Sequence, residues 1–239
     1  MALTYTTYTT TLANLMATTA SDTNFIQIEP SIIDYAEQRC YRELDLLATR
    51  VTDQGTATAN SRSFTTPANN GTFVVVEGVN VYTPVSTTTT RNQLAPASRE
   101  TIDQLWPSET AASAATVPTM YATFTQSTGN TQILFGPPPG AAFNVEVYGT
   151  IRPTPLSVSN TTTFLTTYLP DLFLAASMVF ASGYQKNFSA MSDDPQMGAT
   201  WEKEYKILLQ SANVEEMRKK YVSQGFTDKQ PAPLAAQPY

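Results

Sequence analysis

Carboxylates near the start of a predicted helix are the residues of this chain best suited to chemistry. Asp193 and Asp194 are adjacent, and Glu202 and Glu204 follow within a few helical turns. A glycoside hydrolase uses two carboxyl groups, one as acid and the other as base or nucleophile. Asp194 also precedes Pro195, and such a pair is typical of a helix cap and first turn. The sequence favours the cap and keeps the hydrolase as an alternative.

Other common catalytic and metal-binding side chains are absent or single. The chain has no His and one Cys, Cys40. A Ser-His-Asp or Cys-His hydrolase and the usual His-based metal sites are therefore excluded, and one Cys forms neither an internal disulfide nor a thiolate cage. Cys40 lies on an apolar helical stripe, so we expect a small buried side chain. We predict no cofactor, no metal and no enzymatic activity.

Aromatic side chains in the middle of the chain could stack on a sugar or a base. They are Trp106, Tyr121, Phe124, Phe135 and Tyr148. Because side chains alternate between the two faces of a strand, packing in a core is the favoured interpretation. The net charge of −6, from 14 basic and 20 acidic residues, opposes wrapping of a phosphate backbone, which requires Lys and Arg.

Hydrophobic spacing predicts helices at both chain ends. The first falls within residues 4–17, and the second begins near Pro30 with Ile33, Ala36, Cys40, Leu44 and Leu47 on one stripe and Arg39 and Arg42 in solvent. A further helix starts at Pro170. The last runs from Asp194 to about Ser223, and its buried stripe is Trp201, Tyr205, Leu208 and Ala212.

The middle of the chain changes to a period of two, which is typical of strands. Strands are predicted at 62–66, 73–77, 79–83, 119–126, 132–135 and 144–152, with a hairpin across 119–135 and a short helix at 98–105 capped by Ser98. The fold class is therefore α+β. We expect an α-helical bundle from residues 1–53 and 160–223, with a β-rich module, barrel-like or sandwich-like, inserted at 54–159.

The last segment, residues 224–239, contains Gly225 and three Pro residues and is expected to be extended or disordered. Its apolar residues Phe226, Leu234 and Tyr239 either fray with the rest or bind a partner during assembly. No secretory signal or apolar run of membrane-spanning length is recognised. We expect synthesis in a reducing cytoplasm and no membrane partner.

An ordered set of segments resembles the tail adaptor, or head-to-tail connector, proteins of tailed bacteriophages, particularly short-tailed ones. An early helix with an Ala-Glu pair, an Arg and a Glu-Leu is followed by a link into a hairpin, a proline turn between two strands, and two helix starts. These segments are residues 33–45, 105–107, 117–121, 133–139, 145–153, 156–157, 168–171 and 201–205. The resemblance spans about residues 28–217.

The resemblance implies a structural function. Such proteins form a homo-oligomeric ring, typically a dodecamer, that docks beneath the portal protein, extends the DNA channel and offers a platform for tail and nozzle proteins. The implied location is the head-tail junction of the virion, where duplex DNA passes without specific binding. No catalytic residue is carried over.

The acidic balance has two interpretations in that setting. It serves ordinary solubility, or acids such as Asp34 and Glu37 line the channel so that DNA, which carries one charge per about 1.7 Å, does not adhere. Two other functions remain as alternatives: a virion-associated polysaccharide-degrading enzyme, and a receptor-binding tail protein, which is more often trimeric.

Overall fold

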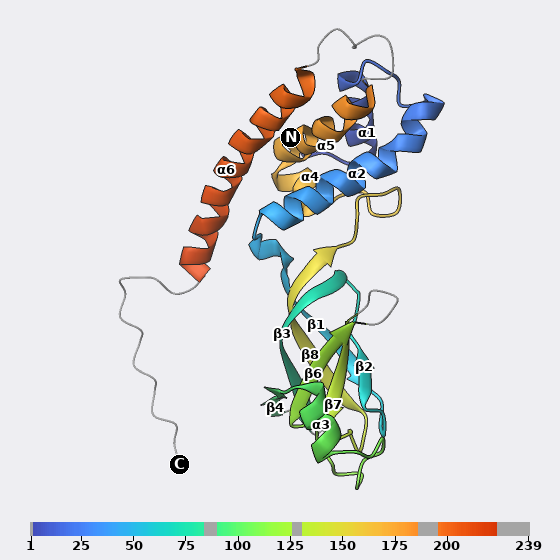
Figure 1. The fold of residues 1–239 in the computed structure, drawn as a ribbon, viewed down its shortest axis with the longest axis vertical. Helices are drawn as coiled ribbons and strands as arrows, with labels where there is room; N and C mark the ends of the chain where they lie inside the picture. The colour runs from blue at the N-terminus through green and yellow to red at the C-terminus, as the bar shows by residue number, and fades with distance from the viewer. Residues whose placement is uncertain (1, 84–89, 126–130, 186–195, 224–239) are drawn as a thin grey trace. The chain divides into compact units, whose positions relative to one another are not determined.

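The structure, a computed structural model, describes residues 2–83, 90–125, 131–185 and 196–223. It divides into two compact units, Met1–Leu47 with Ser157–Tyr239, and Ala48–Leu156 (Figure 1). Helices come from both ends of the chain and sheets from the middle, so the predicted α+β class is confirmed. Of the helices in the described ranges, none combines the length and the apolar character needed to cross a bilayer.

The helical unit is built around one central helix. Its elements are α1 (Tyr5–Leu15), α2 (Thr23–Glu43), α4 (Phe164–Tyr168), α5 (Pro170–Gln185) and α6 (Met197–Ser223). Helices α1, α2, α4 and α6 all contact α5, which carries small and large apolar side chains on a wide face. Phe173 is fully buried there and stacks on Tyr8 of α1, with ring centroids 4.8 Å apart. The Tyr8 hydroxyl is 2.7 Å from the Ser177 hydroxyl, so its polar end is also satisfied.

The start of α2 differs from the prediction. The helix begins at Thr23, and Asp22 caps it by accepting from the backbone N–H groups of Asn24 and Phe25 at 2.9 and 3.0 Å. Pro30 therefore lies inside the helix, where a start was predicted. Burial of Phe25 and Glu29 explains the extension, because both hold the first turns against the bundle.

The other unit contains two four-stranded sheets. One has the order β1-β8-β3-β4 and the second β2-β7-β6-β5. All pairs are antiparallel except β5 with β6. The elements are β1 (Arg50–Ala57), β2 (Ser63–Thr65), β3 (Gly71–Thr83), β4 (Thr90–Gln93), β5 (Ala95–Pro96), α3 (Arg99–Leu105), β6 (Met120–Thr125), β7 (Thr131–Gly136) and β8 (Phe143–Pro153), after a 3-10 turn at Leu47–Thr49.

Alternate residues of the strands form the core of this unit. Val79 and Val81 of β3, Val145 and Val147 of β8, and Phe135 of β7 are fully buried in one cluster. The two strands predicted at 73–77 and 79–83 are one strand, β3, with register shifts after Phe73 and Val76. The Ser98-capped helix is confirmed as α3. The predicted hairpin strands pair as β6 and β7, while residues 126–130 lie outside the described residues.

Core packing accounts for most of the five aromatic residues considered as a stacking platform. Tyr121 and Phe135 belong to the main core of the β-rich unit. Trp106 and Phe124 pack against a smaller cluster formed by Ile102, Ala122 and Leu134. Tyr148 lines a surface hollow.

Candidate assembly surface

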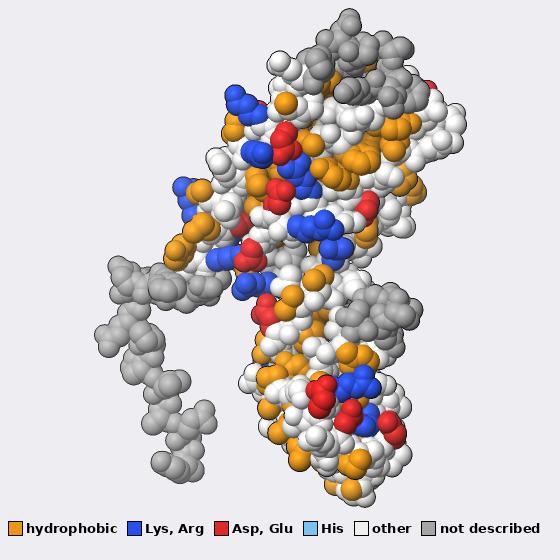
Figure 2. Space-filling view, in the orientation of Figure 1, with side chains coloured by type: hydrophobic (Ala, Val, Ile, Leu, Met, Phe, Trp, Pro, Cys, Tyr) orange, Lys and Arg blue, Asp and Glu red, His pale blue; other side chains and the backbone are white. Residues whose placement is uncertain are grey.

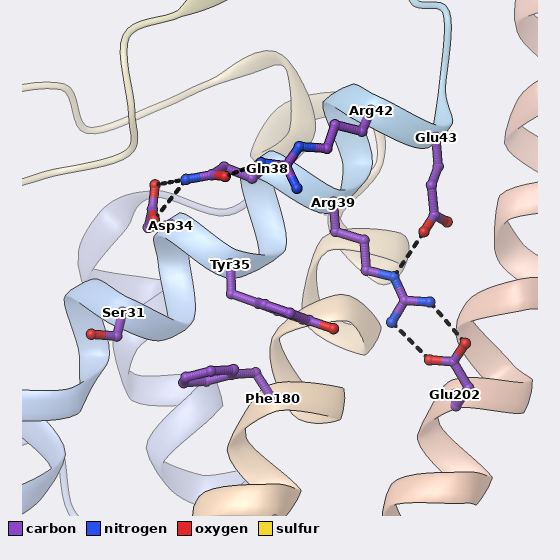
Figure 3. Close-up of a pocket in the computed structure, with 9 residues that line it drawn as sticks. All are labelled: Ser31, Asp34, Tyr35, Gln38, Arg39, Arg42, Glu43, Phe180 and Glu202. Carbon is purple, nitrogen blue, oxygen red and sulfur yellow. Dashed lines mark hydrogen bonds and ion pairs between the residues drawn. The ribbon is translucent and has the colours of Figure 1, made fainter.

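A groove of about 700 Å³ lies on the helical unit between α2, α5 and α6 (Figure 3). Its floor is aromatic, because Tyr35 and Phe180 pack with ring centroids 5.0 Å apart. Its rim is polar: Gln38 Nε2 donates to both carboxylate oxygens of Asp34 at 2.8 Å, and Arg42 Nη2 donates to Gln38 Oε1 at 2.6 Å. An apolar floor with a polar rim is typical of a protein contact surface.

Arg39 ties α2 to α6 at one wall of the groove. Its Nη1 and Nη2 donate to the two carboxylate oxygens of Glu202 at 2.7 and 2.8 Å, and its Nε donates to Glu43 at 3.1 Å (Figure 3). The guanidinium lies 4.1 Å above the Tyr205 ring. Arg39 was predicted in solvent, but its side chain is only 15% exposed, because a planar guanidinium can stack and form paired hydrogen bonds together.

The same contacts decide what Glu202 can do. The Arg39 hydrogen bonds, and then the ion pair with Lys206, lower the pKa of Glu202 to about 2. A carboxyl group that is ionised and bound by a guanidinium is a poor general acid. Glu204 is exposed on α6, and Asp193 and Asp194 lie outside the described residues. Of the four carboxylates considered for the hydrolase alternative, Glu202 and Glu204 are described, and Glu202 is bound by Arg39.

The predicted channel acids have different environments. Asp34 is exposed at the groove rim, whereas Glu37 is only 4% exposed and faces the interior of the helical unit. A buried carboxylate presents little of its charge at the surface of a single chain, and the channel position stays a prediction for both acids. Phe226, Leu234 and Tyr239 lie outside the described residues.

The outer face of α6 carries a second apolar surface that the sequence interpretation missed. Of the predicted inner stripe, Tyr205 and Ala212 are buried, and Trp201 and Leu208 are partly buried. Four other apolar side chains of α6 are about half exposed, and hydrophobic side chains follow the outer edge of this helix in Figure 2. They are Ile207, Val214, Met217 and Tyr221. Their spacing of seven, three and four residues is a heptad pattern that is visible in the sequence alone.

A smaller hollow of about 490 Å³ lies on one sheet of the β-rich unit. Glu146, 4% exposed, accepts from Asn80 Nδ2 at 2.8 Å and from Arg91 Nη2 at 2.6 Å. Both carboxylate oxygens are thus occupied, and the network joins β8, β3 and β4. The Tyr148 ring lies over Gly78, where an added Cβ would be 2.2 Å from the Tyr148 hydroxyl oxygen. The polar side chains in this hollow therefore link neighbouring strands of the sheet.

Cys40 has the environment expected of a structural residue. It is fully buried, and burial raises the pKa of its thiol to about 12. Within the described ranges, no three His, Cys, Asp or Glu side chains lie together as they would around a metal ion.

Replacing Arg39 with Met tests the link between α2 and α6. We expect a loss of about 1–3 kcal/mol in the free energy of unfolding, because Glu202 and Glu43 lose their charged donor while the stem volume is retained. Urea denaturation followed by circular dichroism measures this. Arg42→Met removes a more exposed charge from the same helix and is expected to change stability by less than about 0.5 kcal/mol. Equal losses in both variants would contradict the assignment.

The pH dependence of stability provides a separate test of Glu202. The pKa of Glu202 is lower in the folded state than in the unfolded state. Its contribution to the free energy of unfolding is therefore present above the unfolded-state pKa of about 4.5 and is lost as the pH falls toward 2. We expect the stability difference between wild type and Glu202→Gln to be largest near neutral pH and to shrink between pH 4.5 and 2. A difference that stays constant over this range would contradict the lowered pKa.

Comparison with known proteins identifies a family for this chain. The model of the family described as SU10 adaptor protein matches residues 3–225. No curated protein matches the chain. The family match supports a structural role as a phage adaptor. The chain belongs to the SU10 adaptor protein family.

Proposed function

We propose that this protein forms the ring that joins the portal to the tail in a phage virion and extends the DNA channel. The observation that carries the proposal is the adaptor family match over nearly the whole chain. The surface chemistry agrees with it: charged side chains in the two hollows, such as Arg39 and Glu146, are engaged within the chain, and apolar side chains are exposed on α6.

The proposed partners follow from that location. Copies of the chain form a homo-oligomeric ring, expected to be a dodecamer, between the portal protein above and tail or nozzle proteins below. Duplex DNA passes through the ring without specific binding, consistent with a net charge of −6 per copy.

Electron microscopy of the intact particle tests the proposal. We expect a ring of this chain at the neck, directly under the portal, and filled heads without attached tails when the chain is omitted. A chain absent from the neck would contradict the proposal. A trimer at the distal end of the tail would instead favour a receptor-binding protein, and turnover of a polysaccharide by the purified chain would favour the enzyme alternative.

Asp34 is proposed to face the DNA channel. Its carboxylate is exposed, so reversal of its charge would add an attraction for phosphates along the path of the DNA. We expect Asp34→Lys to slow DNA ejection at low salt and the effect to fade as salt rises. Glu204→Lys makes the same charge change at an exposed position on α6. Equal ejection rates for Asp34→Lys and wild type would contradict a channel position.

The C-terminal residues Phe226, Leu234 and Tyr239 are proposed to bind a neighbouring protein of the particle. Changing all three to Ser keeps the length of the segment and removes its apolar anchors. We expect this variant, like deletion of residues 224–239, to dock poorly on portal particles in a sedimentation assay. Normal docking of both variants would reject the proposal.

A further inference from the structure

Helix α6 has two apolar faces, and one of them is already used. Tyr205 and Ala212 lie on the face that packs in the helical unit. At about 100° per residue, Ile207, Val214, Met217 and Tyr221 fall on the opposite side of the helix. Each of these four side chains is between 48% and 55% exposed. We call this set the outer α6 stripe.

Polar contacts near both ends of α6 fix the direction in which the stripe points. Near the start, Glu202 is held by Arg39 of α2. Near the end, Glu216 is 3% exposed and accepts from the backbone N–H of Leu47 at 2.9 Å and from Lys219 Nζ at 2.7 Å. Rotation of α6 to bury the stripe would break both anchors. The stripe is therefore presented outward by the folded helical unit.

The spacing of the stripe indicates the shape of its partner. Apolar residues at intervals of three and four, repeating every seven, form the seam by which one helix packs on another. The stripe extends from Ile207 to Tyr221, or about 21 Å at 1.5 Å per residue. Isolated exposed apolar side chains need no explanation, but a regular row opposite a packed face favours a helical surface as the partner.

Charge indicates which helical surface is complementary. Residues 197–223, which form α6, contain five basic and four acidic residues, a net charge of +1. The groove beside α2 has Tyr35 and Phe180 at its floor. Its charged lining residues carry a net charge of −1 and are Asp34, Glu43 and Glu202 against Arg39 and Arg42. Apolar side chains flanked by bases, such as Arg218, suit an aromatic floor in a lining of net negative charge.

We propose that the outer α6 stripe of one copy packs on the α2/α5 groove of a second copy of this chain. The two surfaces differ, so the contact is heterologous and leaves one free stripe and one free groove on each pair. Repetition of the contact adds copies until a ring closes, and Asp34 then lies at the edge of the contact, on the side of the channel. The inference rests on the proposed ring and names the surfaces that hold it together.

Disulfide trapping in assembled particles tests the contact. Ser31 lines the groove and Val214 lies in the stripe, so a chain with both Ser31→Cys and Val214→Cys is expected to give a ladder of linked chains after oxidation. The buried Cys40 thiol does not compete. Single-cysteine particles are the controls and are expected to stay unlinked. Linking of the Val214→Cys chain to itself would overturn the proposal, because it would mean that two stripes meet.

Failure of this inference is distinguishable from failure of the proposed function. Neck rings that contain the double-cysteine chain but form no ladder would overturn the stripe-groove contact and leave the adaptor role intact. Absence of the chain from the neck of wild-type particles would remove the adaptor role itself.

Competition for incorporation gives a second measurement that needs no cross-link. When a variant and the wild type are co-expressed in equal amounts, Val214→Asp is expected to enter particles about tenfold less than wild type, because a charge is placed in the centre of the contact. Asn213→Asp changes an exposed residue beside the stripe and is expected to enter equally. Circular dichroism checks that both variants fold. Equal incorporation of folded Val214→Asp would overturn the proposal.

Discussion

Replacing Phe173 with Ala is expected to lower the free energy of unfolding of the helical unit by about 3–5 kcal/mol. Phe173 is fully buried in α5, the helix that every other helix of this unit contacts. The substitution removes the ring that stacks on Tyr8 at 4.8 Å and leaves a cavity that the surrounding helices can only partly fill. The buried hydrogen bond between Tyr8 and Ser177 limits that collapse, because it fixes the Tyr8 ring from its other end.

Urea denaturation followed by far-ultraviolet circular dichroism measures this loss. Val158→Ala is the matched control, since that apolar side chain is 76% exposed, and its effect is expected to stay within about 0.5 kcal/mol. A loss of less than about 1 kcal/mol for Phe173→Ala would contradict its role as the centre of the core.

The parts of the fold that could be predicted from the sequence depend on local patterns. The inner stripe of α6 was predicted because Tyr205 and Ala212 repeat at helical spacing, and α3 because Ser98 is a cap that needs no distant partner. The start of α2 was placed too late because Pro30 is a strong local signal for a first turn. Burial of Phe25 and Glu29 depends on residues distant in sequence, and it overrode that signal.

Strand β1 had too weak a pattern to be predicted. Its inward face consists of Val51, Asp53, Gly55 and Ala57, so Asp and Gly interrupt the apolar alternation in the middle of the strand. Its position comes from pairing with β8. The β3 register shifts are equally dependent on β8: Gly78 appeared to separate two strands, whereas it makes room for the Tyr148 ring on one continuous strand.

The candidate site was the least predictable part. Arg39 appeared to be a solvent residue on α2, and its partner Glu202 lies far along the chain, so no sequence window contains both. Glu37 likewise appeared accessible and is buried. The outer α6 stripe is different, because its heptad spacing lies within one helix. It was overlooked since a buried stripe had already been assigned to the same helix.

Replacing Gly149 with Ala is the second substitution with a large expected effect, a loss of about 3 kcal/mol in the stability of the β-rich unit. An added Cβ would lie 2.1 Å from the backbone oxygen of Val75 and 3.0 Å from the backbone nitrogen of Glu77. Both atoms belong to β3 at its register shift. Strand β8 pairs with β1 on its other side, so it cannot move away from β3 without breaking hydrogen bonds to β1.

Gly183→Ala is the control that separates steric overlap from the loss of a glycine. It lies in α5, and an added Cβ would meet nothing within 4 Å, so Ala is expected to stabilise the helix by about 0.5–1 kcal/mol. Urea denaturation with amide exchange of β8 and α5 assigns each change to its unit. If the contact with the β3 backbone decides the effect at Gly149, Gly149→Ala lowers stability and Gly183→Ala raises it. A loss at both positions would mean that glycine flexibility, and not the approach of β3, decides stability.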